Sequence, residues 1–252
     1  MINIMYLVLT ALLALNVSSE ILNAFKTVNK SLENTNVAVN KSTETIMKSL
    51  LEKTTDPATR ERAEIWYPKA QQVQKLSVEL YSYIAELKNK IITEAGGNPN
   101  DPTKTFKEDN LDVVTRLMVK NGGGNELKKK LEDYSKAIRA IDHAIDSTFK
   151  EPFVDLSDPP GADKKKKEWD VAYFHMVPTV AGLTILSKFQ NDIKTTENKV
   201  VSLCHQKVGE VKVVFDAYAA IVGQNSNYLM PGQQIEIKAG VGAFSKASRP
   251  TI

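Results

Sequence analysis

Cysteine is almost absent from the sequence, which has one, Cys204, in 252 residues. A single thiol excludes an internal disulfide and any zinc site built from several cysteines. An excess of charge of one sign is also lacking, because 33 basic and 30 acidic residues leave a net charge of +3. This balance excludes a strongly basic protein that binds nucleic acid through its overall charge, so we expect no nucleic-acid partner.

Catalytic and metal-binding motifs are lacking as well. The three histidines, His143, His175 and His205, are far apart in the sequence, and none belongs to a His-Glu-x-x-His motif. The glycines Gly122–Gly124 are followed by Asn-Glu, not by the Lys-Ser or Lys-Thr pair of a phosphate-binding loop. We therefore expect no metal, no cofactor and no enzymatic activity.

One long apolar run stands at the N-terminus, where Met1–Val17 reads MINIMYLVLTALLALNV and contains no charged side chain. A helix of this length rises about 25 Å, somewhat less than a hydrocarbon core of about 30 Å. Apolar residues then return at helical spacing at Ile21, Leu22, Phe25 and Val28. This spacing predicts that the helix continues out of the bilayer, and we predict a transmembrane helix over residues 1–25.

A cleavable signal peptide is the main alternative for this segment, because a short apolar run that ends in small residues is typical of one. However, no basic region precedes the run, and Val17-Ser18-Ser19 matches the usual cleavage pattern poorly. These departures favour a membrane helix that is retained. The charge pattern does not orient this helix, since lysines follow the run and no basic residue precedes it.

Most of the remaining chain has the apolar spacing of amphipathic helices. We predict a short helix over residues 41–53 and a longer one that Asp56 caps, with Pro57 at its first position and its end near Ala95. The apolar residues of the longer helix recur every three, four or seven positions, at Trp66, Ala70, Val73, Leu80, Ile84, Leu87 and Ile91. A further short helix is predicted over residues 109–120.

Two more helices complete the predicted bundle. Residues 126–149 have the most regular heptad pattern of the chain, at Leu127, Leu131, Tyr134, Ile138, Ile141 and Ile145. This pattern predicts a helix that packs antiparallel to a neighbour. Residues 151–168 contain prolines and four consecutive lysines, which predicts an exposed loop. A helix of about 45 residues, some 65 Å long, is predicted from Pro178 to Val222 and favours an elongated bundle.

The period changes near the C-terminus, where apolar residues occupy every second position at Ile235, Ile237, Ala239, Val241 and Ala243. This alternation predicts a half-buried strand. Fewer than thirty residues follow Gln224, too few for an independent sheet, so we expect a fragment of a longer protein. The predicted fold class is all-α: a transmembrane helix, a helical bundle over residues 26–224, and the start of a β-rich domain over residues 225–252.

The N-terminal string MINIMYLVLTALLALNVSSEILNAF resembles the start of the GldM/PorM family nearly residue for residue. The resemblance extends through FHMVPTVAGLTILSKFQNDI, at residues 174–193, and LMPGQQIEIKAGVGAFSKA, at residues 229–247. The family provides the motor subunit of the type IX secretion and gliding machinery of Bacteroidetes. The resemblance implies a single-pass inner-membrane helix with a cytoplasmic N-terminus, then an all-helical periplasmic domain, then β domains that reach toward the outer membrane.

The resemblance also implies partners. The subunit is expected to form a homodimer whose two helices pass through a pentameric ring of GldL helices and convert the proton-motive force into movement. Periplasmic and outer-membrane components of the secretion system are expected to contact the later domains. Family members carry a short basic leader before the segment that matches Met1, with an arginine that pairs with a GldL glutamate. The printed sequence has no counterpart of this leader, so the arginine is not transferred.

The apolar run itself indicates how the work of the motor is divided. A proton-driven motor needs an ionisable group in the membrane, since one charge crossing 100 mV supplies about 2.3 kcal/mol. Met1–Val17 has none, and Glu20 lies at the membrane exit, so the protonated carboxylate is expected on the partner and this chain is the driven axle. The residues expected to contact GldL are Tyr6 first, then Asn3, with Thr10 and Asn16 as the remaining polar groups at membrane depth. The alternative for Tyr6 is an interfacial tyrosine, and for Asn16 a helix-exit residue.

Two other functions remain compatible with the residues. A single-span sensor would use the helical region to bind a ligand and would signal inward through a cytoplasmic domain. A secreted helical binding module would be released by signal peptidase. Retention of residues 1–19 in the mature protein would exclude the secreted module.

Overall fold

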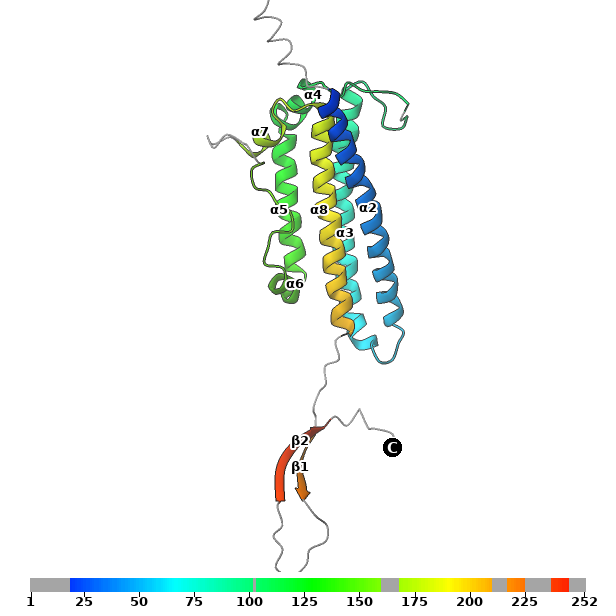
Figure 1. The fold of residues 1–252 in the computed structure, drawn as a ribbon, viewed down its shortest axis with the longest axis vertical. Coiled ribbons are helices and arrows are strands. Elements are labelled where there is room, and N and C mark those ends of the chain that lie inside the picture. The colour runs from blue at the N-terminus through cyan, green and yellow to red at the C-terminus, as the bar shows by residue number, and fades with distance from the viewer. Residues whose placement is uncertain (1–18, 102, 160–167, 210–216, 225–236, 245–252) are drawn as a thin grey trace, which may run out of the picture. The chain divides into compact units, whose positions relative to one another are not determined.

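The computed structural model describes residues 19–101, 103–159, 168–209, 217–224 and 237–244. Contacts divide the chain into two units, with the boundary between Gly209 and Glu210. The first unit is built from α-helices, which agrees with the predicted all-α class (Figure 1). The second contains two antiparallel strands.

The longest helices of the described residues are α2 (Ser19–Lys53), α3 (Arg60–Glu94), α5 (Gly123–Ala140) and α8 (Thr179–Gly209). Shorter elements are α4 (Asp112–Val114), the π-helix η1 (Thr115–Lys120), α6 (His143–Thr148) and α7 (Trp169–Phe174). Figure 1 shows α2, α5 and α8 running in one direction and α3 running against them. Hydrogen bonds confirm the parallel α2 and α8, because Thr184 bonds to Phe25 near one end and Asn198 to Thr43 further along.

Residues 19–53 form one continuous helix, α2, so the separate short helix predicted over residues 41–53 is wrong. The prediction failed because few apolar residues mark the middle of α2. The boundary of α3 also differs. The backbone carbonyl of Asp56 accepts the N–H groups of Thr59 and Arg60 in a turn, so α3 begins at Arg60 and Pro57 precedes it.

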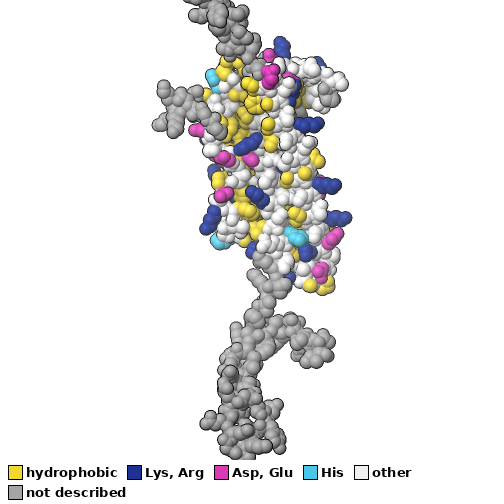
Figure 2. Space-filling model, in the orientation of Figure 1, with side chains coloured by type: hydrophobic (Ala, Val, Ile, Leu, Met, Phe, Trp, Pro, Cys, Tyr) yellow, Lys and Arg dark blue, Asp and Glu magenta, His cyan; other side chains and the backbone are white. Residues whose placement is uncertain are grey.

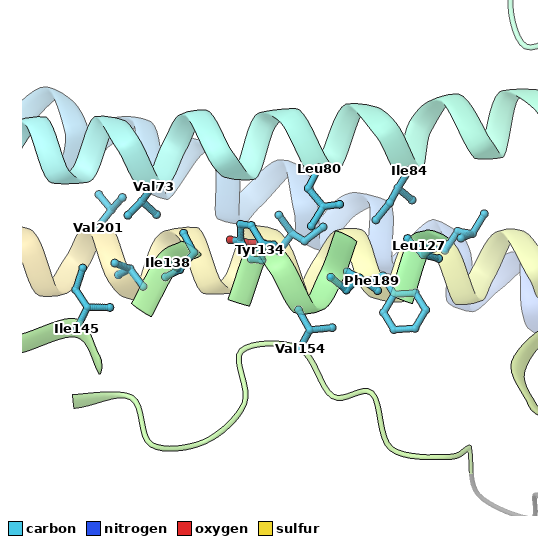
Figure 3. Packing of buried hydrophobic residues seen from close by; sticks show 14 of the residues in the cluster. Val73, Leu80, Ile84, Leu127, Tyr134, Ile138, Ile145, Val154, Phe189 and Val201 are labelled. Atoms are coloured by element: carbon cyan, nitrogen blue, oxygen red, sulfur yellow. The ribbon is translucent and has the colours of Figure 1, made fainter. Parts of the chain in front are cut away.

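The hydrophobic core lies between α3, α5 and α8 (Figure 3). Residues of α3 predicted to face inward are buried there, namely Ala70, Val73, Leu80, Ile84 and Ile91, with Trp66 and Leu87 partly buried. α5 contributes Leu127, Leu131, Tyr134 and Ile138, and α8 contributes Leu186, Phe189, Ile193 and Val200. The hydroxyls of Ser77 on α3 and Tyr134 on α5 lie 2.9 Å apart within this core. α5 packs antiparallel to α3, as its heptad pattern predicts.

The helix predicted over residues 126–149 is interrupted. α5 ends at Ala140, and Asp142 caps α6 by accepting the N–H of Ala144 through its carboxylate. The cap turns the chain, although Ile145 still enters the core. The apolar spacing continues across this turn, which is why the sequence predicts a single helix.

Glycines determine how α5 begins. Gly122 adopts a left-handed conformation with φ of 75°, and α5 starts at Gly123, earlier than predicted. Gly124 lies against α7, where a Cβ atom on it would be 2.5 Å from Cβ of Asp170. Asn125 secures the same contact, because its Nδ2 donates to Asp170 Oδ2 at 3.0 Å.

α8 has 31 residues and ends at Gly209, so the predicted continuation to Val222 is wrong. Part of that continuation instead forms strand β1 (Ala217–Gln224), which pairs antiparallel with β2 (Ile237–Phe244). β2 overlaps the strand predicted from the two-residue alternation, whereas β1 was not predicted. The loop predicted over residues 151–168 is non-helical where it is described, and its lysine run lies outside the described residues.

Candidate functional site: the polar interface of α2 and α8

The predicted site residues Asn3, Tyr6, Thr10 and Asn16 lie outside the described residues. Glu20, predicted at the membrane exit, is the second residue of α2 and is exposed. In the part of the chain that the structure describes, no helix combines the length and the apolar character that crossing a membrane requires.

The most distinctive interface of the helical unit joins α2 to α8. On α2, the residues Asn29, Asn36 and Thr43 are seven positions apart, the spacing of one face of a helix in a parallel coiled coil. Asn36 and Thr43 are 4% and 1% exposed. Two side chains of kinds normally found on protein surfaces are therefore buried on this helix, next to the apolar Met47 and Leu50 toward its end.

In the first half of the interface, hydrogen bonds join α2 and α8 at three successive positions along the helices. Near the start of α2, Thr184 Oγ1 donates to the carbonyl of Phe25 at 3.2 Å. Ser187 Oγ then donates to Asn29 Oδ1 at 2.6 Å. Another two turns along α2, Asn191 Nδ2 donates to Asn36 Oδ1 at 3.0 Å.

The second half continues the pattern. Lys194 Nζ donates to Asn40 Oδ1 at 2.8 Å. Asn198 Nδ2 lies 3.1 Å from the hydroxyl oxygens of both Ser42 and Thr43. Near the end of both helices, Ser49 Oγ and His205 Nε2 are 3.0 Å apart. We call the side chains of these bonds the polar ladder: Asn29, Asn36, Asn40, Ser42, Thr43 and Ser49 on α2, and Thr184, Ser187, Asn191, Lys194, Asn198 and His205 on α8.

A buried ion pair reinforces the ladder on α8. Lys194 is 8% exposed and Glu197 is 1% exposed, and Lys194 Nζ lies 3.0 Å from Glu197 Oε2. Burial raises the pKa of the Glu197 carboxyl, and the hydrogen bond from Lys194 partly opposes that rise. Lys194 thus bonds to a carboxylate on its own helix and to an amide on α2.

α3 contributes a second lysine. Lys88 Nζ donates to Ser187 Oγ at 2.8 Å and lies 3.5 Å from a carboxylate oxygen of Glu33 on α2. Burial lowers the pKa of Lys88, while Glu33 acts in the opposite direction. Its neighbour on α8, Gln190, donates through Nε2 to the carbonyl of Tyr81 on α3 at 3.2 Å. These contacts tie the start of the ladder to α3.

Further along, α2 and α3 are separated by an open groove of about 320 Å³, lined by Asn36, Val37, Asn40, Val78, Tyr81, Ser82 and Lys194. Val37 is 70% exposed at its rim. Among the described residues, the Asn36 Nδ2 atom is buried without a hydrogen-bond partner. α2 is therefore held chiefly by α8.

The polar ladder was not found by reasoning from apolar spacing. That approach located α8 through its opposite face, because Leu183, Leu186 and Ile193 enter the core. The signal that was available is the return of amides and hydroxyls at steps of three, four and seven on both helices. A search for polar heptads would have found Asn29, Asn36 and Thr43.

The three histidines and Cys204 do not come together in one site. His143 begins α6, His175 follows α7, and His205 lies in α8. Among the described residues, no group of three or more His, Cys, Asp or Glu side chains is placed to hold a metal ion. Cys204 is buried, and burial raises the pKa of its thiol to about 12.

Figure 2 shows basic and acidic side chains interspersed over the visible face of the helical unit.

Comparison with known proteins identifies the helical unit. A model of the GldM N-terminal domain matches residues 20–207, which covers most of the chain and nearly all of the helical unit. No curated protein matches the sequence. The match begins one residue after α2 starts and ends two residues before α8 does. The chain therefore belongs to the GldM family, and its helical unit is the GldM N-terminal domain.

Proposed function

We propose that this chain is the inner-membrane-anchored subunit of the motor that uses the proton-motive force to power type IX secretion and gliding. Membership of the GldM family supports a role in this machinery. The observation that carries the proposal is that residues 19–53 are helical, so the first described helix, α2, lies two residues after the end of the apolar run Met1–Val17. If the apolar run is a membrane helix, its movement would reach the helical bundle through α2.

In this proposal the role is mechanical, not enzymatic. The apolar run contains no acidic or basic side chain, so proton transfer belongs to a carboxylate of the GldL-type partner. Two copies of this chain place their membrane helices in a pentameric ring of partner helices. Periplasmic and outer-membrane components receive the movement through the later domains.

The decisive experiment is co-expression of the full-length protein with its GldL-type partner, purification through a tag on this chain, and mass measurement of the intact complex. We expect two copies of this chain with five copies of the partner. Recovery of this chain alone, or shortened by about nineteen residues through signal-peptide cleavage, would contradict the proposal.

A point variant tests the proposed contact in the membrane. Tyr6→Phe in the full-length protein removes one hydroxyl and retains the ring. We expect weaker partner co-purification and reduced secretion. The partner group that bonds to this hydroxyl would lose its hydrogen bond, and no water is present in the membrane to replace it. Tyr67→Phe, a change of the same chemistry in α3, is the matched control. Unchanged secretion and co-purification with Tyr6→Phe would exclude Tyr6 as a contact.

A further inference from the structure

The route of the chain through the helical unit makes the interface of α2 and α8 the shortest mechanical connection across it. α2 begins at one end of the unit, and α8, which runs parallel to it, ends at the other (Figure 1). The covalent route between them passes through α3, α5 and several non-helical segments, which among the described residues include 95–101, 103–111 and 149–159. Force applied to α2 reaches α8 directly through the polar ladder.

The chemistry of the ladder resists sliding along the helix axes. A shift by one turn, about 5.4 Å, would separate Asn36 from Asn191 and Asn40 from Lys194. The buried Asn36 amide would then lose its partner on α8, and the Lys194 ammonium would keep only Glu197 on its own helix, which is costly for buried polar groups. Apolar side chains have no such requirement, since one leucine packs against another in several registers. Buried asparagines fix the register of parallel coiled coils for the same reason.

The neighbouring interface does not provide the same constraint. Across the groove, exposed Val37 and Val78 border an open space of about 320 Å³. The ion pair of Lys88 and Glu33 joins α3 to α2 only toward the start of the ladder. The bonds of the polar ladder join α2 to α8 from Phe25 to Ser49, and a separate ion pair joins Lys26 of α2 to Glu108 in the segment before α4.

We propose that the polar ladder holds α2 and α8 in one fixed register, so that the two helices move as a single rigid body and transmit force from the membrane helix toward the C-terminal domains. Asn36, Asn40, Asn191 and Lys194 are the positioning residues of this element. The inference rests on the proposed motor function and names the path by which force leaves α2.

The first test replaces the central amide pair by leucines, Asn36→Leu with Asn191→Leu, in the full-length protein. Helical content and partner co-purification are expected to stay at the wild-type level, because leucines pack well between helices. Secretion and gliding are expected to fall about tenfold or more, because the register is no longer specified. Asn23→Leu with Asn34→Leu, two exposed positions of α2, is the matched control and should keep wild-type activity.

The second test restores the register of α2 and α8 with a reversible covalent cross-link. Ser42→Cys and Asn198→Cys are added to the leucine variant, and the two thiols are joined by a short bis-methanethiosulfonate reagent that reductant removes. We expect cross-linking to return most of the lost secretion and reduction to abolish it again. In a chain that keeps Asn36 and Asn191, the two cysteines should give the same secretion before and after cross-linking. Variants with one of the two cysteines control for modification alone.

The outcomes separate this inference from the proposed function. If the wild-type chain does not co-purify with the ring partner, the proposed function itself fails. If it does, but the leucine variant is fully active, fixed register is not required and the inference is overturned. Loss of activity on cross-linking the wild-type chain, reversed by reductant, would also overturn it, because it would show that α2 slides along α8.

Discussion

At the scale of single residues, the interface of α2 and α8 depends on side chains whose burial is favourable only while their partners remain. A hydrogen bond contributes about 1 kcal/mol when intact, whereas a buried group that has lost its partner costs about 1–3 kcal/mol. Lys194 is the extreme case, because it bonds to Asn40 and Glu197 while it is 8% exposed. Stability at this interface is therefore sensitive to the removal of one partner from a pair.

Lys194→Met tests that sensitivity. The methionine fills similar space but leaves the Glu197 carboxylate, which is 1% exposed, without its cation. We expect a loss of about 3 kcal/mol in the free energy of unfolding, measured by urea denaturation followed by circular dichroism. Lys199→Met, at an exposed position five residues along α8, should change it by less than about 0.5 kcal/mol. Equal effects of the two changes would show that the ion pair has no structural role.

The pKa of Glu197 predicts a pH dependence. Burial raises that pKa above the ordinary value of 4.5, so the folded state binds the proton more tightly than the unfolded state. The contribution to stability is full below the unfolded pKa and is lost as pH rises through the folded pKa. Urea denaturation across this range should show wild-type protein losing stability relative to Glu197→Gln as pH rises. A difference that is constant, or that grows in the opposite direction, would contradict this assignment.

At the scale of elements, the contact between α5 and α7 depends on the absence of a side chain. Gly124→Ala would place a Cβ atom 2.5 Å from Cβ of Asp170 and 2.8 Å from the carbonyl oxygen of Met118. Either α5 or α7 must shift, and we expect a loss of about 1–3 kcal/mol in the free energy of unfolding. Gly209→Ala is the control, because no atom of the described residues lies within 4 Å of a Cβ there. Urea denaturation of both variants measures the difference, and an unchanged Gly124→Ala protein would refute the tight contact.

The elements also show what apolar spacing predicts. α3 and the first part of α5 were predicted with their buried faces because one side of each helix packs into the core, at residues such as Val73 and Leu131. The middle of α2 was missed because its buried face is polar. The break after Ala140 and the end of α8 at Gly209 were missed because apolar residues keep their period across both points. Where a helix ends depends on caps and tertiary contacts, which the period does not contain.

The candidate site was less accessible to sequence reasoning than the fold. Tyr6 and its polar neighbours were selected from their position in an apolar run and from family resemblance, and they lie outside the described residues. The polar ladder, by contrast, consists of residues that look like ordinary surface positions when each helix is considered alone. Its pairing, such as Asn36 with Asn191, requires two segments more than 150 residues apart to meet.

At the scale of the whole molecule, the helical unit has its own core and its own hydrogen-bond network. We therefore expect a protein of residues 19–209 to fold without the C-terminal strands, because the core residues of α3, α5 and α8 all lie within this range. Its urea midpoint, followed by far-UV circular dichroism, should match that of the helical signal in the whole chain. A markedly lower midpoint would show that the C-terminal unit stabilises the bundle.

The direction of the long helices has an electrostatic consequence. A helix carries about half a positive elementary charge at its N-terminus and about half a negative one at its C-terminus. In a bundle that alternates up and down these macrodipoles cancel, but α2, α5 and α8 point one way against α3 alone. Because α2 is predicted to continue the membrane helix, its positive end does not lie at this end of the bundle. The starts of α5 and α8 against the end of α3 leave about half a positive elementary charge there, which belongs to the backbone and not to any side chain. With the proposed topology this charge faces the bilayer, where it favours phosphate headgroups and opposes tilting of the bundle away from the membrane.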